Sequence, residues 1–383
     1  MKVSINSYAN KVFHTHESSN TLNPQKVQVV LGFGDKNILA SEKMYGQLRN
    51  NYPVADIVLC STSGEIFNNR VLDNSVSVTA IEFEKTTIKT ASVNIDDHQN
   101  NSYEAGQGLV KQLPLSDSLC YIMIISDGGK VNGSELVSGI NRIIQHKVPV
   151  TGGLAGDGAD FISTVAGLNA DPVTGKIVAI AFYSKHLIVS HGSLGGWETL
   201  GLESTITRSI ANQLFEINNE NALDVYKRCL GPYAEELPAS ALMFPLSVQL
   251  SFNAEPVVRT ILSIDAASKS MVFAGDVPAG SKIRFMKGDL NKLINAASDA
   301  ANQALTNKPG ANKPSFALLI SCVGRKIVLD NRVEEEVEAV HEVLGNTTLM
   351  SGFYSYGEIS PTSANTQCEL HNQTMTITTF DEK

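Results

Sequence analysis

The chain has 383 residues, of which 43% are hydrophobic and 18% charged, and its formal net charge is -9. This profile is typical of a compact globular protein and excludes a disordered one, and the length indicates two domains or one large repeated assembly. The acidic balance, without a cluster of Lys and Arg, argues against a nucleic-acid partner, because that affinity depends on basic groups that neutralise phosphates.

The start of the chain shows no basic segment followed by an apolar run, and no stretch reaches the ~20 apolar residues that span a bilayer. We therefore expect a cytoplasmic protein without membrane association. The cysteines lack any C-x-x-C spacing, which indicates reduced thiols in the core and excludes a zinc ribbon. They are Cys60, Cys120, Cys229, Cys322 and Cys368.

One arrangement of strand, helix, strand, Gly-containing turn and closing strand recurs three times, over 27–83, 120–183 and 316–380. The glycines that end the first strand and mark the turn are 30, 30 and 33 residues apart, from Gly34 to Gly64, Gly128 to Gly158 and Gly324 to Gly357. These lengths are close to the ~30 residues of a βαβ unit. We predict a mixed α/β (α+β) fold, in which repeated βαβ-type units form mixed sheets covered by helices.

The turns of the three copies are rich in Gly, Ser and Asp and follow strand ends. In open α/β sheets a ligand usually binds beyond the carboxyl ends of the strands, where glycines allow the backbone to approach it. The sequence leaves two interpretations open, a binding site built from the converging turns and ordinary tight turns between strand and helix.

The region between the second and third copies is not repeated. Its apolar patterns predict a strand at 187–190, helices at 206–214 and 222–230, strands at 246–250, 257–263 and 270–274, and a long helix at 290–305. We place a boundary near 218–235. The predicted organisation is an N-terminal strand or tail at 1–24 and two domains at 25–220 and 221–383.

Several motifs in this order resemble the FIST family, the sensory module named for F-box and intracellular signal transduction proteins. They are the Gly-Glu-Ile turns at Gly64 and Gly357, the Ser-x-Gly-Gly-Trp segment that ends at Trp197, the run from Ala222 to Gly231, the run from Val258 to Asp265, and the run from Phe353 to Ile359. The resemblance covers roughly residues 25 to 382, with the N-terminal and C-terminal FIST halves in tandem.

The resemblance implies an input domain that binds a small ligand and passes the signal on. Stand-alone bacterial chains of this kind include haem-containing nitric-oxide sensors that act on histidine kinases or cyclic-di-GMP enzymes. We therefore expect a haem b-based nitric oxide sensor with such an enzyme as a separate partner, since no output segment is recognised in this chain. A homodimer is a further possibility. The alternatives are a haem-free sensor of a small organic anion, such as an amino acid, and an enzyme of unknown class.

A haem iron needs an axial ligand, most often His, in a largely apolar pocket. We favour His191, which follows a strand and precedes glycines, with Trp197 packed against the macrocycle; the alternative is a structural histidine. His14 and His16 form a second candidate pair, and His341 is interpreted as a residue at the edge of the core. The others are interpreted as surface residues: His98, His146, His186 and His371.

Arg259 lies inside an apolar strand, so its guanidinium either binds a carboxylate or haem propionate or points to water from an edge strand. Glu65 and Glu358 occupy equivalent turn positions and are candidate partners of Arg259 or anchors of turn amides. Tyr354 and Tyr356 either line a pocket or belong to the core.

Catalytic motifs for nucleotide, metalloprotease or hydrolase chemistry are missing from the sequence, so we expect no enzymatic activity. Cys322 and His341 form the one pair that suggests a thiol nucleophile, and nothing in their spacing makes them neighbours. The acidic run Glu334 to Glu336, followed by Glu338, is interpreted as a solvated helix face.

Overall fold

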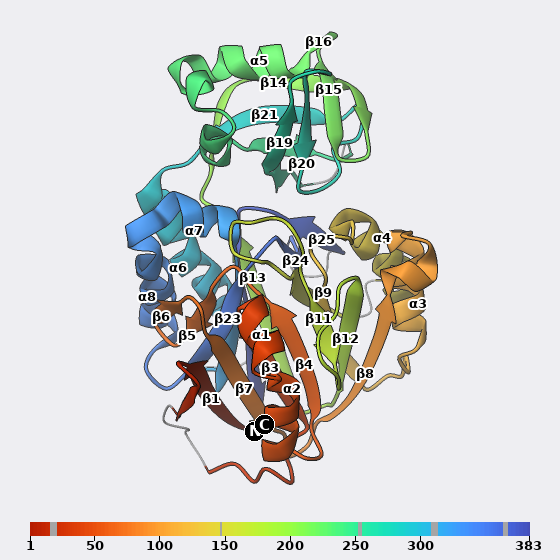
Figure 1. Ribbon diagram of the computed structural model, residues 1–383, viewed down its shortest axis with the longest axis vertical. Coiled ribbons are helices and arrows are strands. Elements are labelled where there is room, and N and C mark those ends of the chain that lie inside the picture. Colours follow the sequence, from red (N-terminus) through yellow and green to blue (C-terminus); the bar gives the residue numbers. More distant parts are fainter. Residues whose placement is uncertain (16–20, 146–147, 252–254, 308–312, 363–366) are drawn as a thin grey trace.

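The computed structural model describes residues 1–15, 21–145, 148–251, 255–307, 313–362 and 367–383, and it divides into a body and a domain inserted into it (Figure 1). The body consists of three equivalent units. Unit 1 contains β1 (Lys2–Ala9), β2 (Val12–Thr15), β3 (Val29–Gly34), α1 (Lys36–Ser41), α2 (Met44–Asn51), β4 (Asp56–Ser61), β5 (Glu65–Phe67), β6 (Arg70–Leu72) and β7 (Val76–Glu82).

Units 2 and 3 follow the same plan, except that a helix follows their first strand where unit 1 has β2. Unit 2 contains β8 (Thr87–Asn94), the 3-10 helix η1 (Ile95–His98), α3 (Ser102–Lys111), β9 (Leu119–Ser126), α4 (Gly133–Ile144), β10 (Val150–Leu154), β11 (Ala166–Leu168) and β12 (Lys176–Tyr183). Unit 3 contains β13 (Leu187–Leu194), α6 (Leu290–Thr306), β22 (Phe316–Cys322), α7 (Val323–Leu329), η4 (Asp330–Arg332), α8 (Val333–Leu344), β23 (Leu349–Ser355), β24 (Gly357–Pro361), β25 (Cys368–His371) and β26 (Met375–Glu382).

Each unit forms a four-stranded sheet with the same strand order, β4-β3-β7-β1, β10-β9-β12-β8 and β23-β22-β26-β13. In each sheet the first two strands are parallel and the remaining pairs are antiparallel. Each unit then lends a strand to the next sheet: β11 pairs with β4, β24 with β10, and β5 with β23. This cyclic exchange gives the body an approximate threefold symmetry.

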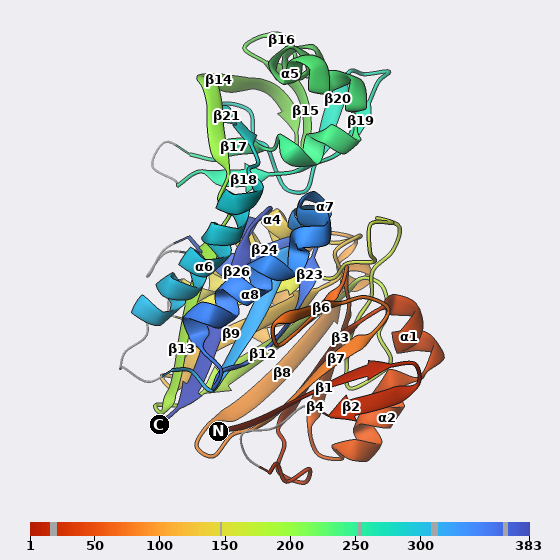
Figure 2. The ribbon, with the colours of Figure 1, turned by 90° about the vertical axis from the view of Figure 1, so that its left-hand side faces the viewer.

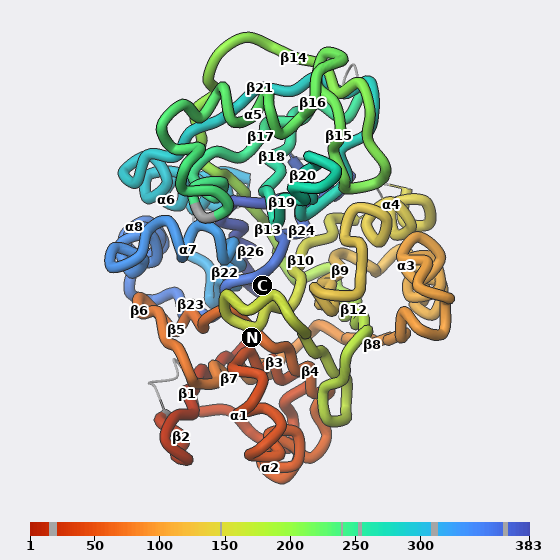
Figure 3. The backbone as a smooth tube through the Cα atoms, turned by 45° about the horizontal axis from the view of Figure 1, so that its top comes forward, coloured from red at the N-terminus to blue at the C-terminus, as the bar shows by residue number. Residues whose placement is uncertain are grey.

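The three sheets surround one apolar core, to which all of them contribute, including Phe33, Tyr121, Phe182, Phe353 and Phe380. A separate apolar layer lies between the outer face of each sheet and its own helices. Figure 3 shows the three helix groups, α1 and α2, α3 and α4, and α6 and α8, on three sides of the body. Two buried faces explain why the central strands are continuous apolar runs, as the sequence predicted.

The inserted domain occupies residues 198–287, between β13 and α6 of unit 3, so the predicted boundary near 218–235 falls inside it. Figure 2 shows β13 and α6 side by side below this domain. Its elements are β14 (Glu198–Ile210), β15 (Gln213–Ile217), β16 (Glu220–Asn221), α5 (Ala222–Leu230), η2 (Gly231–Glu236), η3 (Ala239–Met243), β17 (Leu246–Gln249), β18 (Val257–Arg259), β19 (Ile261–Asp265), β20 (Ser270–Phe273) and β21 (Lys282–Lys287). They enclose a core of their own.

The mixed α/β fold is confirmed, but one predicted helix is wrong. The segment through Ile206, Ile210 and Leu214 forms β14 and β15, with Ile210 exposed. β-Branched Thr and Ile residues alternate through this segment and favour a strand. The helices predicted at 222–230 and 290–305 are present as α5 and α6.

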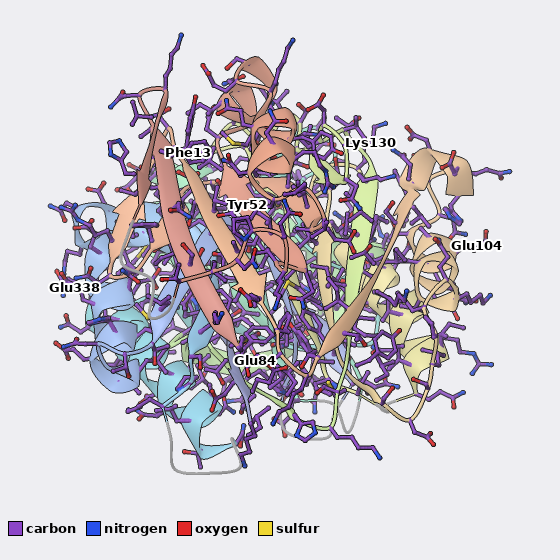
Figure 4. All side chains as sticks on the ribbon, turned by 90° about the horizontal axis from the view of Figure 1, so that it is seen from below. Phe13, Tyr52, Glu84, Glu104, Lys130 and Glu338 are labelled. Atoms are coloured by element: carbon purple, nitrogen blue, oxygen red, sulfur yellow. The ribbon has the colours of Figure 1, made fainter. Side chains whose placement is uncertain are left out.

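Two surface predictions are also wrong. Glu336 is fully buried, because Arg325 neutralises it, whereas Glu334 and Glu338 of the same run are exposed. Figure 4 shows Glu338 at the outer surface of α8. His371 is buried as well, since its Nε2 lies 3.0 Å from the carbonyl oxygen of Ser360. The predictions for His16 and His146 lie outside the described residues.

Candidate ligand-binding site

The turns of the three units meet at one end of the body in a closed ring of backbone hydrogen bonds. The bonds run from Ser63 N to Tyr354 O at 2.9 Å, from Gly156 N to Ser61 O at 2.9 Å, and from Tyr356 N to Leu154 O at 3.2 Å. Each turn thus binds the strand end of a neighbouring unit. In this ring Gly64 and Gly357 occupy equivalent positions. Gly158 of unit 2 corresponds to the following position, which is Glu65 in unit 1 and Glu358 in unit 3.

Glu65 and Glu358 are buried anchors of their own turns. Glu65 accepts hydrogen bonds from Thr62 Oγ1 at 2.6 Å and Ser75 Oγ at 2.5 Å. Glu358 accepts equivalent bonds from Ser355 Oγ at 2.6 Å and Thr374 Oγ1 at 2.9 Å. Burial raises the pKa of each carboxyl to about 8, against the opposing effect of these hydroxyl donors. Both side chains therefore hold the turns together.

Tyr356 connects the turn of unit 3 to the loop that follows the turn of unit 2. Its hydroxyl donates to Asp157 and accepts from Phe161 N at 3.1 Å, and its ring stacks on Phe161 with centroids 4.6 Å apart. Asp157 also accepts the backbone amides of Ile162 and Ser163 at 3.0 and 2.7 Å. Phe161 has a φ of 53°, a left-handed conformation that a bulky residue rarely adopts. These contacts hold the aromatic pair at the end of the body.

Two adjacent cavities lie where this end of the body faces the inserted domain. The α4 cavity has a volume of about 310 Å³ and includes the turn Gly128–Gly133 that leads into α4. The α7 cavity has a volume of about 220 Å³ and includes Cys322, Val323 and Gly324 at the start of α7. Four residues line both cavities: Phe161 and Tyr356 of the body, and Leu262 and Ala274 of the inserted domain. We call the two cavities together the cleft.

The glycine turn in the α4 cavity uses its backbone amides internally. Asp127 Oδ1 accepts from the amides of Gly129 and Lys130 at 2.8 and 2.6 Å, and Thr164 Oγ1 accepts from Gly128 N at 2.8 Å. The Lys130 ammonium pairs with Asp96. Because these donors already have acceptors, the turn by itself offers little to an anion.

Arg259 is fully buried, and its hydrogen-bond partners among the described residues do not include Glu65 or Glu358. Its guanidinium donates to the carbonyl oxygens of Leu370, Asp276 and Val258 at 2.8, 3.1 and 3.2 Å. Burial lowers its pKa to about 10, partly offset by the charges of Glu369 and Asp276. Arg259 lines a separate cavity of about 400 Å³, outside the cleft.

His191, Arg259 and the buried His371 are close enough for their charges to interact. The pKa of His371 is lowered to about 4, mainly by burial and further by the charges of Arg259 and His191. Burial also lowers the pKa of His191. His371 is the strand partner of Glu358. The structure thus brings three of the predicted site residues around a histidine that the sequence assigned to the surface.

His191 lies outside the cleft. His191 lies on the edge strand β13 opposite Thr378 and lines neither cavity of the cleft. Among the described residues that line the cleft there is no histidine. A haem pocket must enclose most of the macrocycle beside its ligand. Haem ligation by His191 therefore stays a prediction, and no group of three or more metal-ligating side chains occurs in the described part of the chain.

Trp197 and Tyr354 have structural contacts in this arrangement. The Trp197 indole donates to Gln373 O at 2.8 Å, and its ring lies so close to Gly288 that a Cβ there would be 2.7 Å from Cζ3. Trp197 therefore packs on both segments that connect the inserted domain. Tyr354 is fully buried below α8 and donates to Glu336 Oε1 at 2.8 Å.

Sequence reasoning missed the buried network around Arg325 and the cleft residues Phe161, Thr260 and Asn372. Arg325 donates to Glu336 Oε2 at 2.7 and 2.9 Å and to three backbone carbonyls, those of Gly195, Leu293 and Gln373. A cation next to the apolar strand β22 was a signal that could have found Arg325. Thr260 and Asn372 carry no such signal, because only the packing of distant segments makes them cavity walls.

Two family models match the chain, the FIST N domain over residues 28–220 and the FIST C domain over residues 222–361. No curated protein matches it. Among solved structures, a cyanuric acid hydrolase from A. caulinodans is similar with a TM-score of 0.38 and 9% identity, covering 94% of this chain and 92% of that chain. Similarity at this level supports no functional conclusion. Among the described helices, none combines the length and the apolar character needed to cross a bilayer.

Proposed function

The chain belongs to the FIST family, whose domains are sensory domains of signal transduction, and we propose that it senses a small organic molecule bound in the cleft. The observation that carries this proposal is the shared wall of the two cavities. Phe161 and Tyr356 come from the body, and Leu262 and Ala274 come from the inserted domain. Ligand sites commonly lie at domain interfaces, in partly preformed and largely apolar cavities.

A ligand in this position contacts both domains, so its binding energy favours the arrangement of the domains that encloses it. Trp197 packs on both connecting segments, at Gly195 and Gly288, so we expect its fluorescence to change with that arrangement. We propose that a separate histidine kinase or cyclic-di-GMP enzyme recognises the ligand-bound arrangement. Adding the chain, with and without ligand, to such an enzyme and measuring its phosphorylation or turnover tests this step.

The cleft is tested by a thermal-shift screen of single-ring organic compounds, with the fluorescence of the chain's only tryptophan as a second signal. The variant Ala274→Phe fills the wall that both cavities share, and it should abolish the stabilisation given by any compound that binds. Leu202→Phe is the matched control, because Leu202 is 89% exposed on the same domain. A compound that stabilises both variants equally binds outside the cleft and contradicts the proposal.

The haem prediction is tested on the same protein by adding haemin and recording the absorption spectrum. We expect only the spectrum of free haemin. A sharp Soret band that shifts with nitric oxide and is lost in His191→Ala would replace the cleft ligand by haem as the sensed group.

A further inference from the structure

We infer that the ligand of the cleft contains a flat aromatic or heteroaromatic ring system and stacks on the ring of Phe161. This inference rests on the proposed function and specifies the class of its ligand. Three properties of Phe161 carry it: its exposure in the wall of both cavities, its stacking contact with Tyr356, and its backbone conformation.

The side chain of Phe161 is accessible in the cleft. Phe161 is 47% exposed and lines both the α4 cavity and the α7 cavity. Its neighbour Ile162 is exposed and lines the α4 cavity, and Leu262 is exposed on the inserted domain and lines both. A ligand that covers these side chains removes their apolar surface from water, and exposed apolar side chains that gather in this way mark binding sites.

Tyr356 stacks on the Phe161 ring and leaves part of it open. The two rings are nearly parallel, with an interplanar angle of 16° and centroids 4.6 Å apart. A stacked neighbour covers one of the two faces of a ring, and nearly half of Phe161 remains exposed. A flat aromatic ligand that stacks on Phe161 extends this pair, and such contacts attract by more than their area burial. A saturated ring of the same size gains only the burial.

The backbone conformation of Phe161 is unfavourable for a residue with a bulky side chain. Its φ of 53° is left-handed. Among the described residues other than glycine with a left-handed φ, it is the only aromatic one, and most of the others are Asn, Gln or Lys. Residues held in such conformations cluster at ligand sites, where the surrounding structure keeps them in place. This conformation favours a functional role for the aromatic ring over that of an ordinary loop residue.

Tyr356 and Asp157 hold this conformation by hydrogen bonds. The Tyr356 hydroxyl accepts from the amide of Phe161 and donates to Asp157, which also accepts from the two amides that follow Phe161. The Asp157 carboxylate is itself buried and lies 3.7 Å from the Lys36 ammonium. The ring of Phe161 is therefore held in position before a ligand binds, which reduces the ordering cost of binding.

The experiment measures binding of a matched pair of probes, 2-naphthol and decahydro-2-naphthol, by calorimetry on the full chain. The two probes share a carbon skeleton and a hydroxyl group, but only 2-naphthol is flat and aromatic. We expect 2-naphthol to bind about three- to tenfold more tightly, because stacking adds about this much to area burial. Its own fluorescence should change in the complex.

The variant Phe161→Leu removes the aromatic ring and keeps an apolar side chain in the wall. It should abolish the preference for 2-naphthol over the saturated probe, whereas Phe161→Tyr should retain that preference. Tyr233→Leu is the matched control. Tyr233 is 46% exposed and its ring contacts Phe244 with centroids 5.1 Å apart, but it lines neither cavity of the cleft. This control should leave the affinities for both probes unchanged.

Equal affinities for the two probes, tighter binding of the saturated probe, a preference that survives Phe161→Leu, or no binding of either probe would overturn the inference. The failure of the proposed function looks different. If Ala274→Phe abolishes binding of both probes and the parent chain does not distinguish them, the cleft is the site and only the ligand class is wrong. If the preference depends on Phe161 but Ala274→Phe leaves it unchanged, stacking on Phe161 is right and the proposed function is wrong.

Discussion

The body and the inserted domain each bury an arginine completely, but the two guanidinium groups have different hydrogen-bond partners. In the body, Arg325 pairs with the buried carboxylate of Glu336, which also accepts from Ser321 and Tyr354. In the inserted domain, Arg259 donates to backbone carbonyls of the described residues, and one of them, Leu370 O, belongs to the body. The first arginine fastens a unit internally, and the second fastens one domain to the other.

The two arginines reflect the different structural roles of the body and the inserted domain. The threefold exchange of strands gives the body a continuous core, and its buried charges are paired within that frame. The inserted domain has its own core and meets the body through Arg259, Trp197 and the cleft. The proposed sensing mechanism uses this combination, in which the body holds one wall of the cleft and the separately folded domain supplies the other.

The largest effect is expected from Glu336→Gln, which leaves Arg325 buried without a counter-charge. Removing one partner of a buried pair costs about 3–5 kcal/mol, so the urea midpoint should fall steeply. The control is Glu338→Gln on the exposed side of α8, which should change stability by less than about 0.5 kcal/mol. Equal effects of the two variants on stability would show that Glu336 is exposed to solvent, as the sequence suggested.

A second effect concerns pH and the two turn carboxyls. Glu65 and Glu358 ionise near pH 8 in the folded chain, since burial raises the pKa of each to about 8, and near pH 4.3 when unfolded. The folded chain therefore holds more protons between these values, and the stability that is present below pH 4 is lost as the pH rises to 8. Each carboxyl should contribute a loss of about 2 kcal/mol between pH 6 and 8.

Each of the variants Glu65→Gln and Glu358→Gln should lack the part of the stability loss between pH 6 and 8 that its carboxyl causes. Each should be more stable than the parent chain at pH 8. Unfolding in urea at several pH values measures the slope. A parent chain whose stability rises from pH 6 to 8 would show that these carboxyls are ionised in the folded state.

A smaller effect is expected from Arg259→Met, because its acceptors are neutral carbonyls and Met retains most of the apolar contact. We expect a loss of about 1–2 kcal/mol, together with faster proteolysis at the segments that join the domains and a shift in Trp197 fluorescence. A loss as large as that of Glu336→Gln, with no change in proteolysis, would remove the distinction between the two arginines.

The smallest effect is expected from a thiol reagent applied to the native chain. Cys229 in the inserted domain is exposed, whereas Cys60, Cys322 and Cys368 in the body are buried. Mass spectrometry should find Cys229 modified first, with no measurable change in stability. Early modification of Cys322 would indicate that the α7 cavity opens to solvent.

Much of the body was predictable from the sequence alone. Local apolar patterns identified the central strands of all three units and the helices α2, α4, α6 and α8, because each pattern depends on residues that are neighbours in the chain. The turns around Gly64 and Gly357 and the family motifs were also visible, and the FIST assignment made from them is confirmed by the family models. In the inserted domain, the internal strand β21 and the hairpin of β14 and β15 were missed; the spacing of Ile206, Ile210 and Leu214 in that hairpin also fits one face of a helix.

Only the tertiary structure decided which residues form a site. The exchange of β5, β11 and β24 among the sheets brings residues 154–164, 322–324 and 356 to one end of the body. The placement of an inserted domain over that end turns Thr260 and Asn372 into walls of one cavity. Such contacts join residues about a hundred positions apart, and their energy depends on packing and desolvation in three dimensions, so no local pattern in the sequence records them.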